Sequence, residues 1–159
     1  MIKLAPDSEI SVITEEMRSM LGVEVGPQAH EIEKGMIKKF AEAIDDPNPL
    51  WQDEAYAENA RYGSIVAPPG FLFVTELMEQ PLWAMSVKCP LKGFVNAGND
   101  FEYFQPIKPG DVISVTGKLV DLQEKQGKTG KIAIMIMERT YTNQRGETVA
   151  KARYTLIRM

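Results

Sequence analysis

The residues best suited to chemistry in this sequence stand in the run Asp45-Asp46-Pro47-Asn48-Pro49-Leu50-Trp51. A carboxylate such as that of Asp46 takes up and returns protons, as general acid–base catalysis requires. The Asn48-Pro49 pair favours a turn that would hold Asp46 and Trp51 on one side of a cleft. An indole N–H donates hydrogen bonds but accepts no proton near neutral pH, so Trp51 cannot be a general base.

The two aspartates also have a purely structural interpretation. A helix that ends before Pro47 needs polar groups around its last turn, and Asp readily hydrogen-bonds the neighbouring backbone. On residue type alone, this interpretation is favoured for both Asp45 and Asp46. The acid–base hypothesis depends on the whole frame from Asp46 to Trp51.

Apolar residues at helical spacing predict four helices around this frame. They cover residues 9–21, 36–44, 53–60 and 71–78. The first has Ser8 as a plausible N-cap and ends at Gly22. The second must stop at Asp45 or Asp46, because Pro47 cannot continue it. The last is apolar on nearly every side, which is typical of a helix wrapped by a sheet.

Alternation and turn residues predict the strands. A short first strand covers residues 29–32, after a break at Gly26-Pro27, and four long strands cover residues 94–104, 111–122, 131–141 and 148–157. Their turn-rich connections favour an antiparallel meander. The run Ile132 to Met137, in the third of these long strands, is apolar on both faces, so we expect a second layer outside the sheet and at least a dimer. Helices first and sheet afterwards predict an α+β domain.

Composition narrows the function classes. The 159 residues fit one domain, and the net charge of -4 argues against nucleic acid as a partner. No apolar run reaches the roughly 20 residues that span a bilayer, and nothing resembles a secretory signal, so we expect a cytoplasmic protein without a membrane partner. The lone Cys89, expected in the core, and the lone His30 provide neither a zinc site nor a Ser/His/Asp triad.

Three segments in this order resemble a known family: Phe40 to Trp51, Tyr62 to Leu72, and Phe101 to Asp111. The chain is similar to the MaoC-like dehydratases and (R)-specific enoyl-CoA hydratases of the hotdog superfamily, and closest to the fatty-acid-synthase-like N-terminal dehydratase subgroup. The resemblance implies an antiparallel sheet wrapped round the 71–78 helix, dimerising through sheet edges as a double hotdog. Residues 1–21 would be an N-terminal helical extension, and residues 22–159 a single hotdog domain.

Members of this family with the complete motif, Asp-x-Asn-Pro-x-His, add water to enoyl thioesters or remove it from 3-hydroxyacyl thioesters. Carried over by position, Asp46 matches the acid–base aspartate and Asn48 the motif asparagine, while Trp51 replaces the catalytic histidine. A backbone N–H at the start of the central helix would face the thioester oxygen. Pro68 and Pro69 have no N–H, so Gly70 is the first donor there.

The resemblance therefore implies a chain that keeps the acyl cleft without independent catalysis. Its partners would be an acyl-CoA or acyl-carrier-protein thioester and a second hotdog subunit, in a homodimer or a heteromer, with no cofactor and no metal. Candidate wall residues of the cleft are Trp51, Phe71 and Phe73, for which core packing is an equal alternative. Gly70 is the candidate contact to the thioester.

Three alternatives stay open. A self-sufficient homodimeric hydratase would use Asp46 alone, acting through water. A non-enzymatic acyl-CoA binding or scaffold protein would bind thioesters without turnover. A thioesterase would also need only one carboxylate, but the Asn-Pro frame fits hydratases better.

Basic residues that could meet phosphates are scattered along the chain. They are Arg61, Lys88, Lys92 and Arg153. Scattered basic residues usually face solvent, so the sequence selects none of them as a binding residue.

Overall fold

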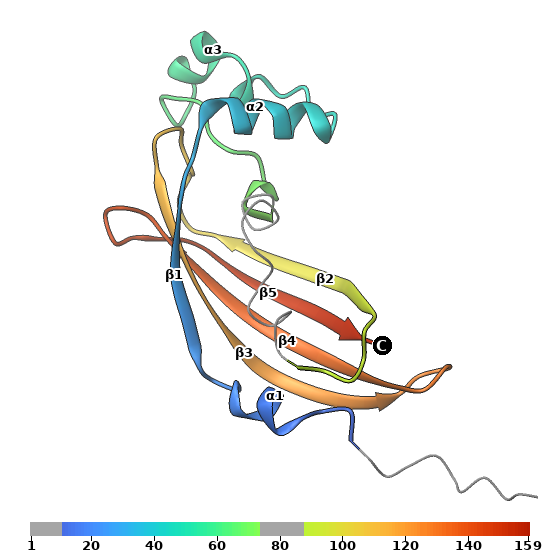
Figure 1. Ribbon diagram of the computed structural model, residues 1–159. Coiled ribbons are helices and arrows are strands. Elements are labelled where there is room, and N and C mark those ends of the chain that lie inside the picture. Colours follow the sequence, from blue (N-terminus) through green and yellow to red (C-terminus); the bar gives the residue numbers. More distant parts are fainter. Residues whose placement is uncertain (1–10, 74–87) are drawn as a thin grey trace, which may run out of the picture.

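The computed structural model describes residues 11–73 and 88–159. Its centre is a five-stranded antiparallel sheet in the order β1-β3-β4-β5-β2 (Figure 1). The strands are β1 (Glu24–Glu31), β2 (Phe94–Tyr103), β3 (Val112–Gln126), β4 (Lys131–Thr142) and β5 (Thr148–Arg158). The helices are α1 (Glu15–Ser19), α2 (Lys34–Ala43), the 3₁₀ helix η1 (Pro49–Trp51) and α3 (Glu54–Asn59). The predicted α+β class is confirmed.

Figure 1 shows α2 and α3 together beyond one end of the sheet, with α1 near the opposite end and β1 running between them. Two of these helices match their predicted ranges closely. The α2 helix buries Ile37 and Ala41 and ends at Ala43, with Ile44 as C-cap. The α3 helix is capped by the side chain of Asp53, which accepts a hydrogen bond from the Tyr56 N–H.

The helix predicted over residues 9–21 is much shorter. It begins at Glu15, and its N-cap is Thr14 rather than Ser8. Residues 11–14 are not helical, because the carboxylate of Glu124 accepts hydrogen bonds from Ser11 Oγ at 2.9 Å and from the Val12 N–H at 2.7 Å. A distant strand therefore overrides local helical periodicity at this point.

The first strand is longer than predicted. It begins at Glu24 and passes through Gly26-Pro27, with a register shift between Val25 and Gln28. Proline is tolerated there because β1 lies at the edge of the sheet, where a missing N–H and a bulge break no central ladder.

The predicted meander is correct only for β3, β4 and β5. The strand β2 pairs antiparallel with β5, from Phe94 opposite Arg158 to Tyr103 opposite Ala150, and not with its sequence neighbour β3. Residues 104–111 connect β2 to β3 and are too many for a tight hairpin turn, so they carry the chain to the other side of the sheet.

The core lies between the inner face of the sheet and the start of the central helix. Residues 71–73 are helical, as predicted, and the rest of the predicted helix to Met78 lies outside the described residues. Phe71 and Leu72 are 1% and 0% exposed. Alternate residues of β4 are buried against this core: Ala133, Met135, Met137, Arg139 and Tyr141.

Four further features concern the outer face of β4, Cys89, membrane-spanning helices and metal ligands. The outward residues of β4, Ile132, Ile134 and Ile136, are half-buried, and the layer expected over them stays a prediction. Cys89 is half-buried and packs against the core. Across residues 11–73 and 88–159, no helix is long and apolar enough to cross a bilayer. The same residues contain no cluster of His, Cys, Asp and Glu suited to a metal ion.

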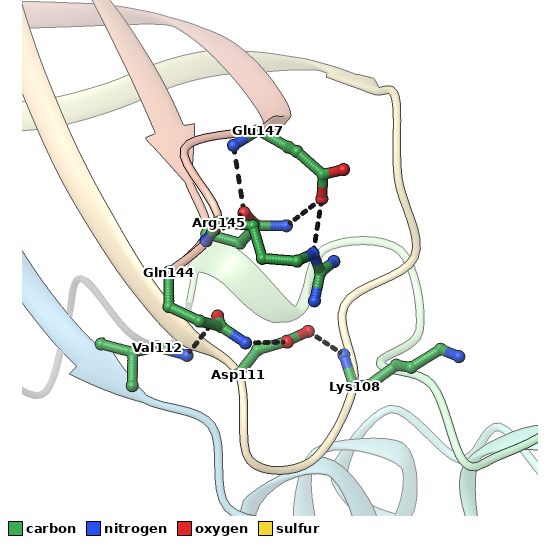
Figure 2. A network of polar contacts seen from close by, with 7 residues as sticks. Lys108, Asp111, Val112, Gln144, Arg145 and Glu147 are labelled. Carbon is green, nitrogen blue, oxygen red and sulfur yellow. Dashed lines mark hydrogen bonds and ion pairs between the residues drawn. The ribbon is translucent and has the colours of Figure 1, made fainter.

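The turn between β4 and β5 clamps the loop that connects β2 to β3 (Figure 2). Asp111, only 7% exposed, accepts hydrogen bonds from the Lys108 N–H at 2.8 Å and from Gln144 Nε2 at 3.0 Å. The Val112 N–H donates to Gln144 Oε1 at 3.0 Å. These bonds hold residues 105–109, which approach the candidate site, in one conformation.

Candidate ligand site

The loop after α2 is built by its own short-range hydrogen bonds. The Asp46 N–H donates to the Ala41 carbonyl at 2.9 Å, and Asp45 takes a left-handed φ of 54°. Asn48 Oδ1 accepts from the Leu50 N–H at 3.0 Å and so caps η1. Asp and Asn tolerate such conformations and bond the nearby backbone readily, which explains why this sequence turns here. The turn buries Trp51 to 9% exposure.

Both carboxylate oxygens of Asp46 accept hydrogen bonds from this loop. Oδ1 accepts from the Asn48 N–H at 3.0 Å, and Oδ2 accepts from Trp51 Nε1 at 2.9 Å. Gln52 Nε2 also donates to the Asp46 carbonyl at 2.9 Å. The structure therefore brings together Asp46, Asn48 and Trp51, as the frame predicts, but the residue at 51 donates a hydrogen bond to the carboxylate instead of accepting a proton.

Gly70 lies where the central helix begins, with a left-handed φ of 87°. Its N–H, the first available after Pro68 and Pro69, donates to the hydroxyl of Tyr103 at 2.9 Å. The ring of Tyr103 stacks on Phe101, with a centroid distance of 5.8 Å and an interplanar angle of 14°. The amide that the resemblance assigns to a thioester oxygen therefore already has a protein acceptor.

Phe71 and Phe73, the two candidate phenylalanines, both contribute to core packing. Phe71 is 1% exposed and packs edge-on against Phe40, at a centroid distance of 5.7 Å and an angle of 80°. Phe73 is half-buried against the same core. The structure thus places Phe71 in the core.

A cavity of about 470 Å³ opens beside Trp51. Its wall is mostly aromatic, proline and aliphatic, and its only charged lining residue in the described part of the chain is Arg61. The lining residues are Trp51, Arg61, Tyr62, Val66, Ala67, Pro69, Tyr103, Phe104, Gln105, Pro106 and Ile107. We call this the Trp51 cavity. A wall of this kind suits an apolar or flat ligand with few polar groups.

Several backbone contacts fix the walls of the Trp51 cavity. The Ala67 N–H donates to the Ile107 carbonyl at 2.8 Å, and the Val66 N–H donates to the Leu50 carbonyl at 3.3 Å. The first bond joins the approach to the central helix to the clamped 105–109 loop, and the second joins it to η1. The cavity is therefore assembled from three chain segments that the fold brings together.

A second hollow, of about 500 Å³, has Asp46 in its lining but not Trp51. Its charged lining residues are Lys38, Glu42, Asp45, Asp46 and Asp53, so four carboxylates face one ammonium group. We call this the Asp46 hollow. Asp46 and Trp51 are bonded to each other but line different openings.

A family model described as "FAS1-like, dehydratase domain region" matches residues 19–152. The chain belongs to this family. The match covers most of the sequence, and the resemblance to MaoC-like dehydratases of the hotdog superfamily is confirmed.

Curated relatives of this FAS1-like dehydratase-family chain include proteins with and without a described activity. A "UPF0336 protein" of Thermobifida fusca is 30% identical over 103 residues, which are 64% of this chain and 68% of the relative. A "Probable enoyl-CoA hydratase alpha subunit" of Thermomonospora curvata is 29% identical over 138 residues, which are 77% of this chain but 43% of the relative.

Among solved structures, the ChsH1-ChsH2 complex of Mycobacterium tuberculosis contains a similar chain. The TM-score is 0.76 at 23% identity, covering 94% of this chain and 97% of that one. At this identity the likeness concerns the fold. It agrees with an antiparallel hotdog sheet curled round a central helix.

Sequence reasoning did not select Arg61, Tyr62 or Tyr103 as site residues. Tyr62 and Tyr103 stand within the segments that carry the family resemblance, whereas Arg61 lies just before the second segment and was marked only by its positive charge. Their shared position around the Trp51 cavity depends on the pairing of β2 with β5 and on the path of the 104–111 loop.

Proposed function

We propose that this chain is a subunit of an enoyl-thioester hydratase or 3-hydroxyacyl-thioester dehydratase that does not catalyse alone. It lines the acyl cleft and depends on a partner hotdog chain that bears the intact Asp/His motif. The observation that carries the proposal is the 2.9 Å hydrogen bond from Trp51 Nε1 to Asp46 Oδ2. A donor occupies the position from which the reaction needs a proton acceptor.

The chemistry explains why this replacement matters. Hydration needs one group to activate water and another to move a proton to the carbon next to the carbonyl. An indole does neither, and Asp46 uses both oxygens within its own loop. The sole histidine of the sequence, His30, pairs with Ile113 in the β1–β3 ladder and lines neither the Trp51 cavity nor the Asp46 hollow.

The thioester cleft of the proposed subunit includes the Trp51 cavity. Its aromatic and proline walls favour a slender ligand segment without charge, since its burial releases water from apolar surface on both partners. Trp51 forms part of this wall directly, and Gly70 bonds Tyr103, which forms another part. Phe71 and Phe73 support the start of the central helix behind it.

The partner is expected at the β2 edge of the sheet. Both β1 and β2 are edge strands with a register shift, but the shift in β1 contains Pro27, whereas β2 contains no proline. An edge without proline keeps all its backbone N–H groups and accepts another strand more readily. The word "alpha subunit" in one relative's name and the two-component complex among the similar structures support a heteromer.

The test is the loss of enoyl-thioester absorbance with crotonyl-CoA and longer enoyl-CoA substrates. We expect no turnover by the isolated chain and turnover by its complex with a hotdog chain that carries the Asp/His motif. Replacing the partner's motif histidine should abolish activity, while Asp46→Asn and its neighbouring control Asp45→Asn should leave the complex active.

Two other outcomes would replace the proposal. Turnover by the isolated chain that is lost in Asp46→Asn but retained in Asp45→Asn would identify a self-sufficient hydratase. Saturable binding of acyl-CoA without turnover in any pairing would identify a binding protein.

A further inference from the structure

Arg61 stands at the Trp51 cavity on a short turn that is held firmly. The turn follows α3, and the Gly63 N–H closes it by donating to the Ala60 carbonyl at 3.1 Å. Lys108 Nζ donates to the Tyr62 carbonyl at 2.7 Å, which ties the turn to the clamped loop. The guanidinium of Arg61 lies over the Tyr62 ring, 5.5 Å from its centroid. Stacking orients a planar guanidinium and leaves its N–H edge available.

Arg61 differs from the other arginines in what it bonds. Arg18, Arg145 and Arg153 form ion pairs with Glu15, Glu147 and Glu138, and Arg158 donates to the Leu91 carbonyl. Arg139 is buried over the Tyr154 ring. Within residues 11–73 and 88–159, Arg61 makes no ion pair and no hydrogen bond to the protein, although the chain as a whole carries a net charge of -4.

The charges around Arg61 favour an anion in one opening only. No carboxylate is among the described residues that line the Trp51 cavity, whereas four carboxylates line the Asp46 hollow. An anionic ligand is therefore attracted to the first and repelled from the second. Lys108, on the loop that supplies part of the cavity wall, is already bonded to the Tyr62 carbonyl, which leaves Arg61 as the cation for a ligand.

We infer that the Trp51 cavity receives the pantetheine arm of the thioester and that Arg61 binds the phosphate at the end of this arm. The inference rests on the proposed function and specifies the part of the substrate that this chain recognises. Guanidinium and phosphate match in shape and charge and form paired N–H···O bonds. Acyl-CoA and acyl-carrier protein share this phosphate, so one arginine serves either source.

The experiment is isothermal titration calorimetry on the full-length chain with three saturated thioesters that cannot be hydrated. Butyryl-CoA and butyryl-4′-phosphopantetheine contain the phosphate, and butyryl-pantetheine lacks it. The proteins are wild type, Arg61→Gln and Arg18→Gln. The last is a matched control, since it removes the same charge from an exposed arginine on α1.

We expect wild type to bind both phosphorylated thioesters about tenfold more tightly than butyryl-pantetheine. Arg61→Gln should remove this advantage and leave the affinity for butyryl-pantetheine unchanged, while Arg18→Gln behaves as wild type. Arg61 is exposed, so thermal midpoints of the three proteins should agree.

Other results would overturn the inference in different ways. Unchanged binding of phosphorylated thioesters by Arg61→Gln would refute it and leave the proposed function standing. If Arg61→Gln lost as much affinity for butyryl-pantetheine as for the phosphorylated thioesters, a phosphate contact would be refuted. If the variant lost affinity for butyryl-CoA alone, Arg61 would contact the nucleotide instead of the shared phosphate. If no thioester binds wild type, both the inference and the proposed function fail.

Discussion

The Asp46 hollow and the Trp51 cavity are neighbours of similar size, about 500 Å³ and about 470 Å³, with opposite electrostatic character. In the first, a carboxylate is satisfied by its own loop and is surrounded by further acids. In the second, aromatic walls surround one arginine that has no partner ion within the described residues. The Asp46 carboxylate uses its hydrogen bonds to stabilise its own loop, whereas the Arg61 guanidinium keeps its N–H groups for the proposed ligand.

Under the proposed function, this difference separates catalysis from binding within one family fold. The hydrogen bond between Asp46 and Trp51 joins a residue that lines the Asp46 hollow to one that lines the Trp51 cavity. It fixes the carboxylate and the indole ring relative to each other. Under the proposed function, this chain holds the thioester and the partner chain transforms it.

The largest expected effect comes from restoring a proton acceptor at position 51. Trp51→His places an imidazole beside Asp46, and acid–base catalysis of this type contributes about 10²–10⁴ in rate. We expect the variant to hydrate crotonyl-CoA at least about 100-fold faster than the isolated wild-type chain. Loss of enoyl absorbance measures the rate.

Trp51→Phe is the control for that experiment, because it keeps an aromatic wall but supplies no nitrogen. It should gain no activity. Equal rates for wild type, Trp51→His and Trp51→Phe would show that the identity of residue 51 does not limit catalysis.

The next effect concerns stability. Asp46→Ala removes the acceptor of the Asn48 N–H and Trp51 Nε1–H bonds, so we expect the free energy of unfolding to fall by about 1–3 kcal/mol. Urea denaturation measures this change. Asp45→Asn should change stability by less than about 0.5 kcal/mol, because Asn tolerates left-handed backbone. Similar losses in both variants would refute a special role for the Asp46 bonds.

A smaller effect is expected at the wall of the Trp51 cavity. Tyr103→Phe keeps the ring that stacks on Phe101 but removes the acceptor of the Gly70 N–H, at an expected cost of about 0.5–1.5 kcal/mol. The amide proton resonance of Gly70 should move upfield as its hydrogen bond is lost. Tyr56→Phe, at a tyrosine that is 52% exposed, serves as the control and should leave this resonance in place. An unmoved Gly70 signal in Tyr103→Phe would contradict the contact.

The smallest effect concerns Glu124, a hydrogen-bonded carboxylate outside the candidate site. The test is whether its charge contributes to the stability of the folded protein. Hydrogen bonds from Lys131, the Val12 N–H and Ser11 lower the pKa of Glu124 from 4.5 to about 2. Because the pKa is lower in the folded protein, the stabilisation is complete above pH 4.5 and disappears as the pH falls toward 2. The difference in Tm between wild type and Glu124→Gln should therefore shrink across this range.

Glu58→Gln, on the exposed face of α3, is the control and should show little difference from wild type at any pH. A Tm difference for Glu124→Gln that is independent of pH would argue that the Glu124 charge does not anchor the segment before α1.

The fold was predictable wherever local pattern and final neighbours agree. The long strands β2 to β5 and the helices α2 and α3 follow from alternation, periodicity and turn residues that act over a few positions. The helix before Gly22 and the first strand were predicted less well. In the first case, Glu124 bonds Val12 across 112 residues of sequence, and no local pattern contains that partner.

The residues of the candidate site were likewise predictable only where their contacts are local in sequence. Asp46, Asn48 and Trp51 were found from sequence because all their mutual bonds lie within six residues of one loop. Tyr103 was not, because its bond to Gly70 spans 33 residues and depends on where β2 lies in the sheet.

The sequence by itself determined that no imidazole stands at position 51, since side-chain identity fixes what can carry a proton. It also determined the family, through three ordered segments. Only the tertiary structure decided which basic residue is open to a ligand. Arg61 and Arg153 look alike in sequence, but the register of β4 with β5 gives Arg153 the carboxylate of Glu138, whereas Arg61, on the turn after α3, has no ion partner among the described residues. Charge pairing depends on distance in space, and distance in space is set by the fold.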